Sequence, residues 1–234
     1  MSYVAILETG VPPDHLDEVH GSYADMFIKG LAAPGRNFRV FRTLEGELPP
    51  AGDALDGVVI TGSPAGVYED APWIKALIDW LKALDPSVPV AGICFGHQVM
   101  AQAWGGHVEK SDKGWGVGLH EYQVQDANTW RRLSGSDEAL MRVAVSHQDQ
   151  VVQKPEAAEV LASCAFTPNA ALNYTDRKAI SFQCHPEFSA DYARDLWEGR
   201  RARIGNDLID KAVDSLAQHS TRDTMLTAIS RFLG

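Results

Sequence analysis

The chain has 234 residues, enough for one sizeable α/β domain or two small ones, and 45% of them are hydrophobic, as in ordinary globular proteins. Its formal net charge of −10 disfavours a nucleic-acid partner, and no stretch approaches the roughly 18 apolar residues of a membrane span. Three widely separated cysteines and an N-terminus without a basic region or cleavage site argue against a secreted disulfide framework. We therefore expect a cytoplasmic protein with no membrane or nucleic-acid partner.

The first part of the chain alternates between short apolar segments and helical patterns. Pro72 suits the first turn of a helix over 72–84, and a weaker helical pattern over 14–31 is interrupted by Gly21. Such alternation is typical of a parallel sheet with helices on both faces. The expected strands are 3–8, 38–43, 57–62 and 88–94.

The middle of the chain changes character, because strand-like segments follow one another with no long helix between them. They predict antiparallel hairpins added to the sheet and then a return to its core. These segments are 116–125, 140–152, 159–166 and 179–188.

From Asp191 onward the pattern is helical, with breaks near Gly205 and Ser220. We expect this tail to pack on the sheet layer, with an oligomer surface or a cover over a site as alternatives. Its basic cluster, Arg200, Arg201 and Arg203, is expected to be a solvated helix face. No linker divides the chain, so a single domain over 1–234 is predicted, with a core over 3–188 and a helical tail over 190–234.

The stretch GICFG places Cys94 between Gly92 and Gly96, where an apolar strand gives way to a helix. Small neighbours of this kind permit a sharp strand–turn–helix corner that projects a nucleophile. The thiol would lie at the carboxyl end of a strand and at a helix N-terminus, where the thiolate is favoured. A buried structural cysteine is the alternative for this motif taken alone.

The stretch FQCHPEF offers a base and a group to orient it. Residues two apart on an extended segment face the same way, so His185 and Glu187 share a side and Cys184 faces the core. A histidine held by a carboxylate is what a cysteine nucleophile requires. Taken alone, His-Pro-Glu is also common in surface turns.

Two loops complete the pattern. ITGSPAGVYED, over 60–70, follows a strand and can present backbone N–H groups to an oxyanion, together with the N–H of Phe95. SHQDQV, over 146–151, is a short polar segment between strand-like stretches, in which His147 is more readily structural than catalytic.

Together, ITGSPAGVYED, GICFGHQ, SHQDQV and FQCHPE resemble the class I (triad-type) glutamine amidotransferases, in particular the stand-alone subgroup similar to the glutaminase domain of GMP synthase. The resemblance extends from about Tyr3 to Phe188. It implies a flavodoxin-like three-layer α/β/α sandwich with a central, mostly parallel sheet, added antiparallel strands and a helical C-terminal tail. It implies no metal and no cofactor.

The resemblance also implies roles for individual residues. Cys94 would form a γ-glutamyl thioester and release ammonia, His185 would move the protons, and Glu187 would orient the imidazole. The backbone N–H groups of Ser63 and Phe95 would form the oxyanion hole, although many family members have Gly-Gly-Pro where this chain has Gly62-Ser63. The implied substrate-binding residues are Gly62, Gln98, Ser146, His147, Gln148 and Asp149.

Several functions stay open at this point. Free glutamine is the family's usual substrate, but a γ-glutamyl peptide or conjugate would form the same thioester. Since the chain lacks a G-x-x-x-x-G-K-[ST] loop, an acceptor for ammonia would belong to a separate protein. A non-catalytic or partner-gated regulatory module ranks lower because all three triad residues are present. A redox hydrolase on a related fold and a metal enzyme are disfavoured by the HPE element and by the scattered histidines.

Overall fold

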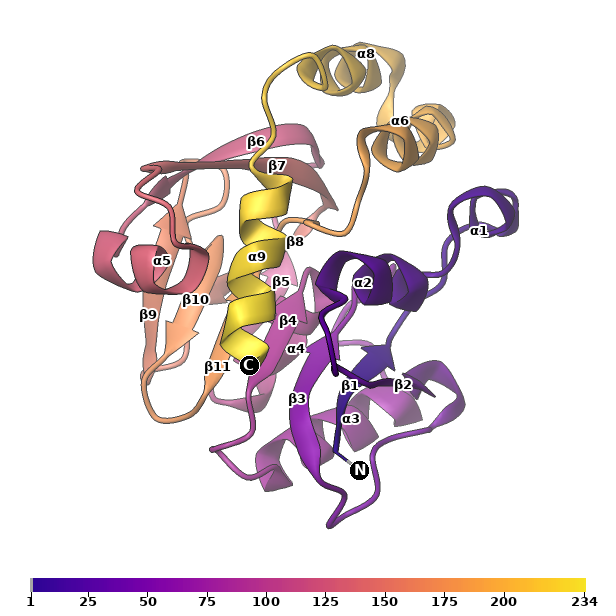
Figure 1. Cartoon of the computed structure of the whole chain (residues 1–234). Helices are drawn as coiled ribbons and strands as arrows, with labels where there is room; N and C mark the ends of the chain where they lie inside the picture. The colour runs from indigo at the N-terminus through magenta and orange to yellow at the C-terminus, as the bar shows by residue number, and fades with distance from the viewer. Residues whose placement is uncertain (1) are drawn as a thin grey trace.

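A nine-stranded sheet runs through the molecule, in a computed structural model that describes residues 2–234 (Figure 1). One part of the sheet is parallel, and antiparallel strands extend it from β11. The parallel strands, in spatial order, are β2 (Phe38–Arg42), β1 (Tyr3–Glu8), β3 (Leu55–Ile60), β4 (Val90–Ile93) and β11 (Ala179–Phe182). The antiparallel strands that follow are β10 (Ala171–Tyr174), β9 (Ala158–Ser163), β6 (Gly116–Val124) and β7 (Leu140–His147).

Helices cover both faces of the sheet. Neighbouring residues of β3 belong to different cores, since Val59 lies in one hydrophobic cluster and Ile60 in the other. On one face lie α3 (Pro72–Ala83) and α4 (Phe95–Ala103); on the other lie α2 (Tyr23–Leu31), α5 (Ala127–Ser134) and α9 (Arg222–Leu233) (Figure 1). The expected three-layer α/β/α architecture with added antiparallel strands is confirmed.

The helical tail divides into two parts. Its last helix, α9, packs on the sheet as expected, with Met225 and Ile229 fully buried. The helices before it, α6 (Ala190–Glu198), α7 (Arg201–Ile204) and α8 (Asn206–Ser215), lie instead beyond β6 and β7 (Figure 1). They form a third cluster there with α1 (Asp14–His20), and the indole N–H of Trp197 donates to the carbonyl of Val145 at 3.1 Å.

Some elements differ from the sequence-based expectation. Helix α5 separates β6 from β7, where no long helix was expected; the Asp126 side chain caps it and Gly135 ends it in the left-handed region. The segment 140–152 is two strands in different sheets, because β8 (Asp149–Gln153) pairs with β5 (His107–Lys110) in a separate two-stranded antiparallel sheet. Neither β5 nor β10 was predicted. The helix breaks at Gly21 and Gly205 are confirmed.

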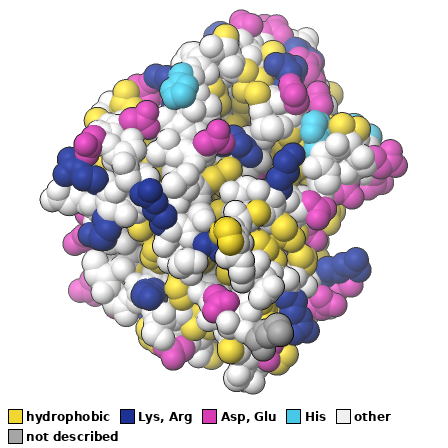
Figure 2. All heavy atoms as spheres, in the orientation of Figure 1, with side chains coloured by type: hydrophobic (Ala, Val, Ile, Leu, Met, Phe, Trp, Pro, Cys, Tyr) yellow, Lys and Arg dark blue, Asp and Glu magenta, His cyan; other side chains and the backbone are white. Residues whose placement is uncertain are grey.

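The surface is unevenly charged. In Figure 2, acidic side chains gather at the corner formed by α1, whose sequence contains Asp14, Asp17 and Glu18. Over residues 2–234, none of the helices is both long and apolar enough to cross a membrane. The same residues contain no group of three or more His, Cys, Asp or Glu side chains placed to hold a metal ion.

Candidate active site

Cys94 occupies the tight corner between β4 and α4. Its backbone has φ 52° and ψ −100°, and no other non-glycine residue of the described chain has a positive φ. A side chain at Gly96 would come within 2.3 Å of the Ile60 carbonyl oxygen, and one at Gly92 within 2.6 Å of the Gly96 backbone. Two glycines therefore let the corner close, and the strain is concentrated on the cysteine between them.

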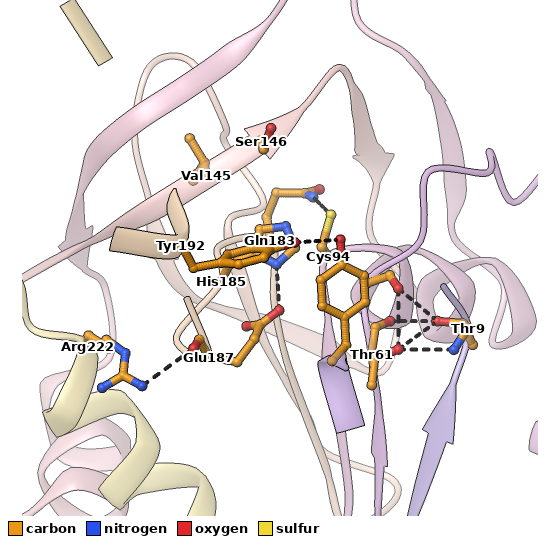
Figure 3. Close-up of polar contacts among 12 residues, drawn as sticks. Thr9, Thr61, Cys94, Val145, Ser146, Gln183, His185, Glu187, Tyr192 and Arg222 are labelled. Carbon is orange, nitrogen blue, oxygen red and sulfur yellow. Dashed lines mark hydrogen bonds and ion pairs between the residues drawn. The ribbon is translucent and has the colours of Figure 1, made fainter. Parts of the chain in front are cut away.

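His185 and Glu187 lie beside this corner, in the turn after β11, because that strand ends at Phe182 and does not continue to 188 as expected. The His185 Nδ1 and a Glu187 carboxylate oxygen are 2.7 Å apart, and both side chains are buried. Because a carboxylate only accepts, Nδ1–H is the donor and Nε2 is left for Cys94 (Figure 3). The His185 ring also stacks on Phe188, with centroids 4.0 Å apart and planes within 6°.

Electrostatics favour the protonated ring. Burial lowers the pKa of His185, but the Glu187 carboxylate and the Cys94 sulfur outweigh burial and raise the pKa to about 10. The site therefore favours the imidazolium, a form in which the ring can give a proton to a leaving group.

The loop after β3 approaches the same point. A Cβ on Gly62 would lie 2.9 Å from His185 Cε1 and 3.6 Å from Cys94 Cβ, so only glycine leaves both side chains room. The Thr9 hydroxyl donates to the carbonyl of Thr61 at 2.9 Å or of Gly62 at 3.3 Å, and the Thr9 N–H donates to Thr61 Oγ1 at 3.0 Å (Figure 3). These fully buried hydroxyls fix the loop that leads to Ser63.

The two expected oxyanion donors are free of partners within the described protein. Ser63 lines the cleft, and no acceptor lies within hydrogen-bond reach of its N–H. Phe95 is the first residue of α4, so its N–H has no carbonyl within the helix to bond. Its ring points away and packs on Trp73, with centroids 5.3 Å apart.

Two glutamines connect the cysteine to the β8 loop. Gln98 donates through Nε2 to the Asp149 carbonyl at 2.9 Å and to Gln183 Oε1 at 3.1 Å. Gln183 in turn directs its Nε2 to Cys94 Sγ at 3.6 Å (Figure 3). Sequence reasoning missed Gln183, although it lies only two residues before His185 and also faces the site. Cys184 faces the core, as expected, and burial raises its pKa.

A cleft of about 210 Å³ opens above Cys94 and His185. All six predicted substrate-binding residues line it, namely Gly62, Gln98, Ser146, His147, Gln148 and Asp149. His147 has a structural contact, because its Nδ1 lies 3.0 Å from the Asp149 carbonyl oxygen and burial lowers its pKa to about 3. Asp149 accepts from the Tyr68 hydroxyl at 3.2 Å, and burial raises the pKa of its carboxyl.

The expectation of a solvated basic helix face was wrong for part of the cluster. Arg200 and Arg203 both line the cleft, and Arg200 is half-buried and donates to Ser146 Oγ on β7. Arg203 is exposed as expected although it lines the cleft, and Arg201 pairs at the surface with Glu198 and with Asp210. The physical reason is tertiary: α7 turns over the end of β6 and β7, which a local pattern does not reveal.

The sequence of the chain matches the family model described as glutamine amidotransferase class-I over residues 15–195, well over half its length. The chain belongs to the class I glutamine amidotransferase family. Gamma-glutamyl peptidase 4 of Arabidopsis thaliana is 33% identical to this family member over 184 residues, covering 76% of this chain and 73% of the peptidase. The glutamine-hydrolyzing GMP synthase of Nitrosococcus oceani is 31% identical over 194 residues, covering 74% of this chain and 35% of the synthase.

A solved structure agrees on the fold of this family member. The crystal structure of a glutamine amidotransferase from Thermotoga maritima superposes with a TM-score of 0.74 at 20% identity, over 99% of this chain and 96% of the other. The family and the flavodoxin-like sandwich predicted from the four motifs are thus both confirmed.

Proposed function

We propose that this protein hydrolyses a γ-glutamyl amide through a thioester on Cys94. The observation that carries the proposal is the strained Cys94 corner beside a buried His185–Glu187 pair at 2.7 Å. Family membership supports the same reaction class, and so does the likeness to a γ-glutamyl peptidase.

In the first half of the reaction the thiol proton of Cys94 passes to His185 Nε2, which forms the imidazolium that the site favours, and Cys94 Sγ attacks the γ-carbonyl carbon of the substrate. The N–H groups of Ser63 and Phe95 stabilise the negative oxygen of the tetrahedral intermediate. His185 then protonates the leaving nitrogen, the C–N bond breaks, and an amine departs; with glutamine this amine is ammonia.

In the second half His185 takes a proton from water, and the resulting hydroxide attacks the thioester carbon. The C–S bond breaks, glutamate leaves, and the thiol is restored. Glu187 keeps Nδ1–H directed at its carboxylate in both halves, so Nε2 is always the nitrogen that exchanges protons.

A second candidate differs only in the substrate. A γ-glutamyl peptide carries the same γ-carbonyl as glutamine, and the basic side chains of Arg200 and Arg203 in the cleft favour it, because glutamine has no charge on its leaving side. If glutamine is the substrate, a separate protein would accept the ammonia.

The test is glutamate release from L-glutamine and from γ-glutamyl-alanine, with Cys94→Ala as the control. We expect release that the substitution abolishes. Release that persists in Cys94→Ala would contradict the mechanism. No release from either compound, together with no mass adduct of a glutamine analogue on Cys94, would favour a non-catalytic module.

A further inference from the structure

The charges in the cleft fall into two groups. Asp149 interacts with Tyr68, Lys110 and Glu69, which also line the cleft. Arg200 instead interacts with Tyr23, Tyr192, Arg203 and Cys94. Asp149 and Glu69 line the cleft that contains Cys94, and so do Arg200 and Arg203, so a bound substrate meets an acidic group and a basic group.

The basic group lacks a carboxylate partner. Among residues 2–234, neither Arg200 nor Arg203 has an acidic side chain within ion-pair distance, whereas Arg201 between them lies 2.7 Å from Asp210. In a chain with a net charge of −10, two unpaired arginines directed into one cleft are unlike its other surface arginines, most of which are paired.

Each of these arginines is held in place without being neutralised. The Arg200 guanidinium is half-buried and donates to Ser146 Oγ, which leaves most of its five N–H groups unused. The Arg203 guanidinium lies over the Trp115 ring, 4.7 Å from its centroid, and Trp115 also lines the cleft. A fixed pair of planar donors is suited to a carboxylate, which accepts two parallel hydrogen bonds from one guanidinium.

The γ-glutamyl unit itself supplies one ammonium and one carboxylate, and the acidic group beside the 146–149 loop suits its ammonium. A peptide substrate adds a second carboxylate on the side that leaves with the nitrogen. We propose that Arg200 and Arg203 bind this leaving-side carboxylate, so that the preferred substrate is a γ-glutamyl peptide with a free C-terminal carboxylate. This inference rests on the proposed hydrolysis at Cys94.

The test compares kcat/KM for γ-glutamyl-alanine, its C-terminal amide and glutamine. The wild type is expected to prefer the free acid over the amide, and Arg203→Met is expected to reduce that preference roughly 10- to 100-fold, the range for a lost charge-assisted hydrogen bond. Arg203 is exposed, so this variant is expected to fold; Arg200→Met should act in the same direction once its melting temperature has been checked. Arg201→Met is the matched control, because its side chain pairs outside the cleft.

Two results would overturn the subsite. One is an acid-to-amide ratio that Arg203→Met leaves unchanged. The other is an equal loss on all three substrates, which would place the arginines on the glutamyl unit's own carboxylate. If the wild type splits none of the substrates, the proposed function fails separately; calorimetric binding of the free acid and the amide to Cys94→Ala then decides the subsite without turnover.

Discussion

The backbone conformation at Cys94 favours glycine, but the proposed chemistry requires the cysteine side chain. A φ of 52° with a ψ of −100° is a conformation that L residues rarely adopt, and strain of this kind costs about 1–3 kcal/mol. The residue is nevertheless a cysteine, fixed between Gly92 and Gly96 and facing His185. The strain is therefore expected to contribute to placing the sulfur rather than to stabilising the fold.

Comparing two substitutions at this position isolates the strain. In regular secondary structure, a protein with glycine at a position is ordinarily less stable than one with alanine there, by about 0.5–1 kcal/mol. Here we expect Cys94→Gly to be more stable than Cys94→Ala by about 1 kcal/mol, because only glycine adopts this φ without strain. Both variants should lack turnover. Urea denaturation checks the order, and a more stable alanine variant would show that the corner is unstrained.

Glu187 is predicted to act through His185. Glu187→Gln keeps the shape but removes the charge, so the pKa of His185 should fall and kcat should drop roughly 10²-fold or more.

The raised pKa of His185 stabilises the fold below the unfolded histidine's pKa and ceases to do so as the pH rises through about 10. The gap in unfolding free energy between wild type and variant should therefore be wider at about pH 6 than at about pH 10.5. An equal gap at both pH values would argue against the pairing; Glu198→Gln, at an exposed pair, is the control.

At the scale of elements, the parts of the site that local sequence specifies were predictable. Glycines flanking Cys94 indicate the corner, and the two-residue spacing predicts that His185 and Glu187 share a side, although a turn after β11 and not a strand brings them together. The spacing also applies to Gln183, which a search confined to acids, bases and nucleophiles overlooks. Arg200 could not be placed from sequence, because its role depends on α7 turning over the distant strands β6 and β7. Helix α5 was missed although its cap at Asp126 and its stop at Gly135 are both visible in the sequence.

The contact between the ends of β1 and β3 gives a prediction of its own. Thr9→Val keeps the shape of the side chain but removes the hydroxyl that donates to the carbonyl of Thr61 or of Gly62. We expect a loss of about 1–3 kcal/mol in stability and a lower kcat, because the loop carrying Ser63 is no longer held. Thermal denaturation and steady-state kinetics measure the two effects. Thr175→Val, which removes an exposed hydroxyl bonded to Ala157, should change neither by much; an unaltered kcat in Thr9→Val would mean that the loop is fixed by other contacts.

At the scale of the whole molecule, the helices of the C-terminal tail contribute to two different hydrophobic clusters. Helix α9 belongs to the main core beneath β3 and β4, whereas α6 and α8 belong to the separate cluster beyond β6 and β7. The tail thus closes one face of the sheet with α9 and forms a wall of the cleft with α6 and α7. Damage to these two parts should have different consequences.

Ile229→Ala tests this division. Ile229 is fully buried in α9, so we expect a loss of about 2–5 kcal/mol in the free energy of unfolding. Leu208→Ala in α8 should cost far less, since Leu208 is 36% exposed. Chemical denaturation of both variants gives the comparison, and similar losses would contradict the assignment of α9 to the main core.

The position of α9 also bears on how the protein is made. A chain leaves the ribosome from its N-terminal end, so β3 and β4 emerge long before the helix that covers them. Until then Val59, Ala91 and Ile93 face solvent on one side, and Arg36 lacks the Ser230 and Gly234 carbonyls to which it donates at 2.8 Å. The nascent chain therefore exposes a hydrophobic surface that chaperones can recognise. The cysteine corner is synthesised early, but the cleft around it is completed only when the tail has been translated. The active site is therefore complete only late in synthesis.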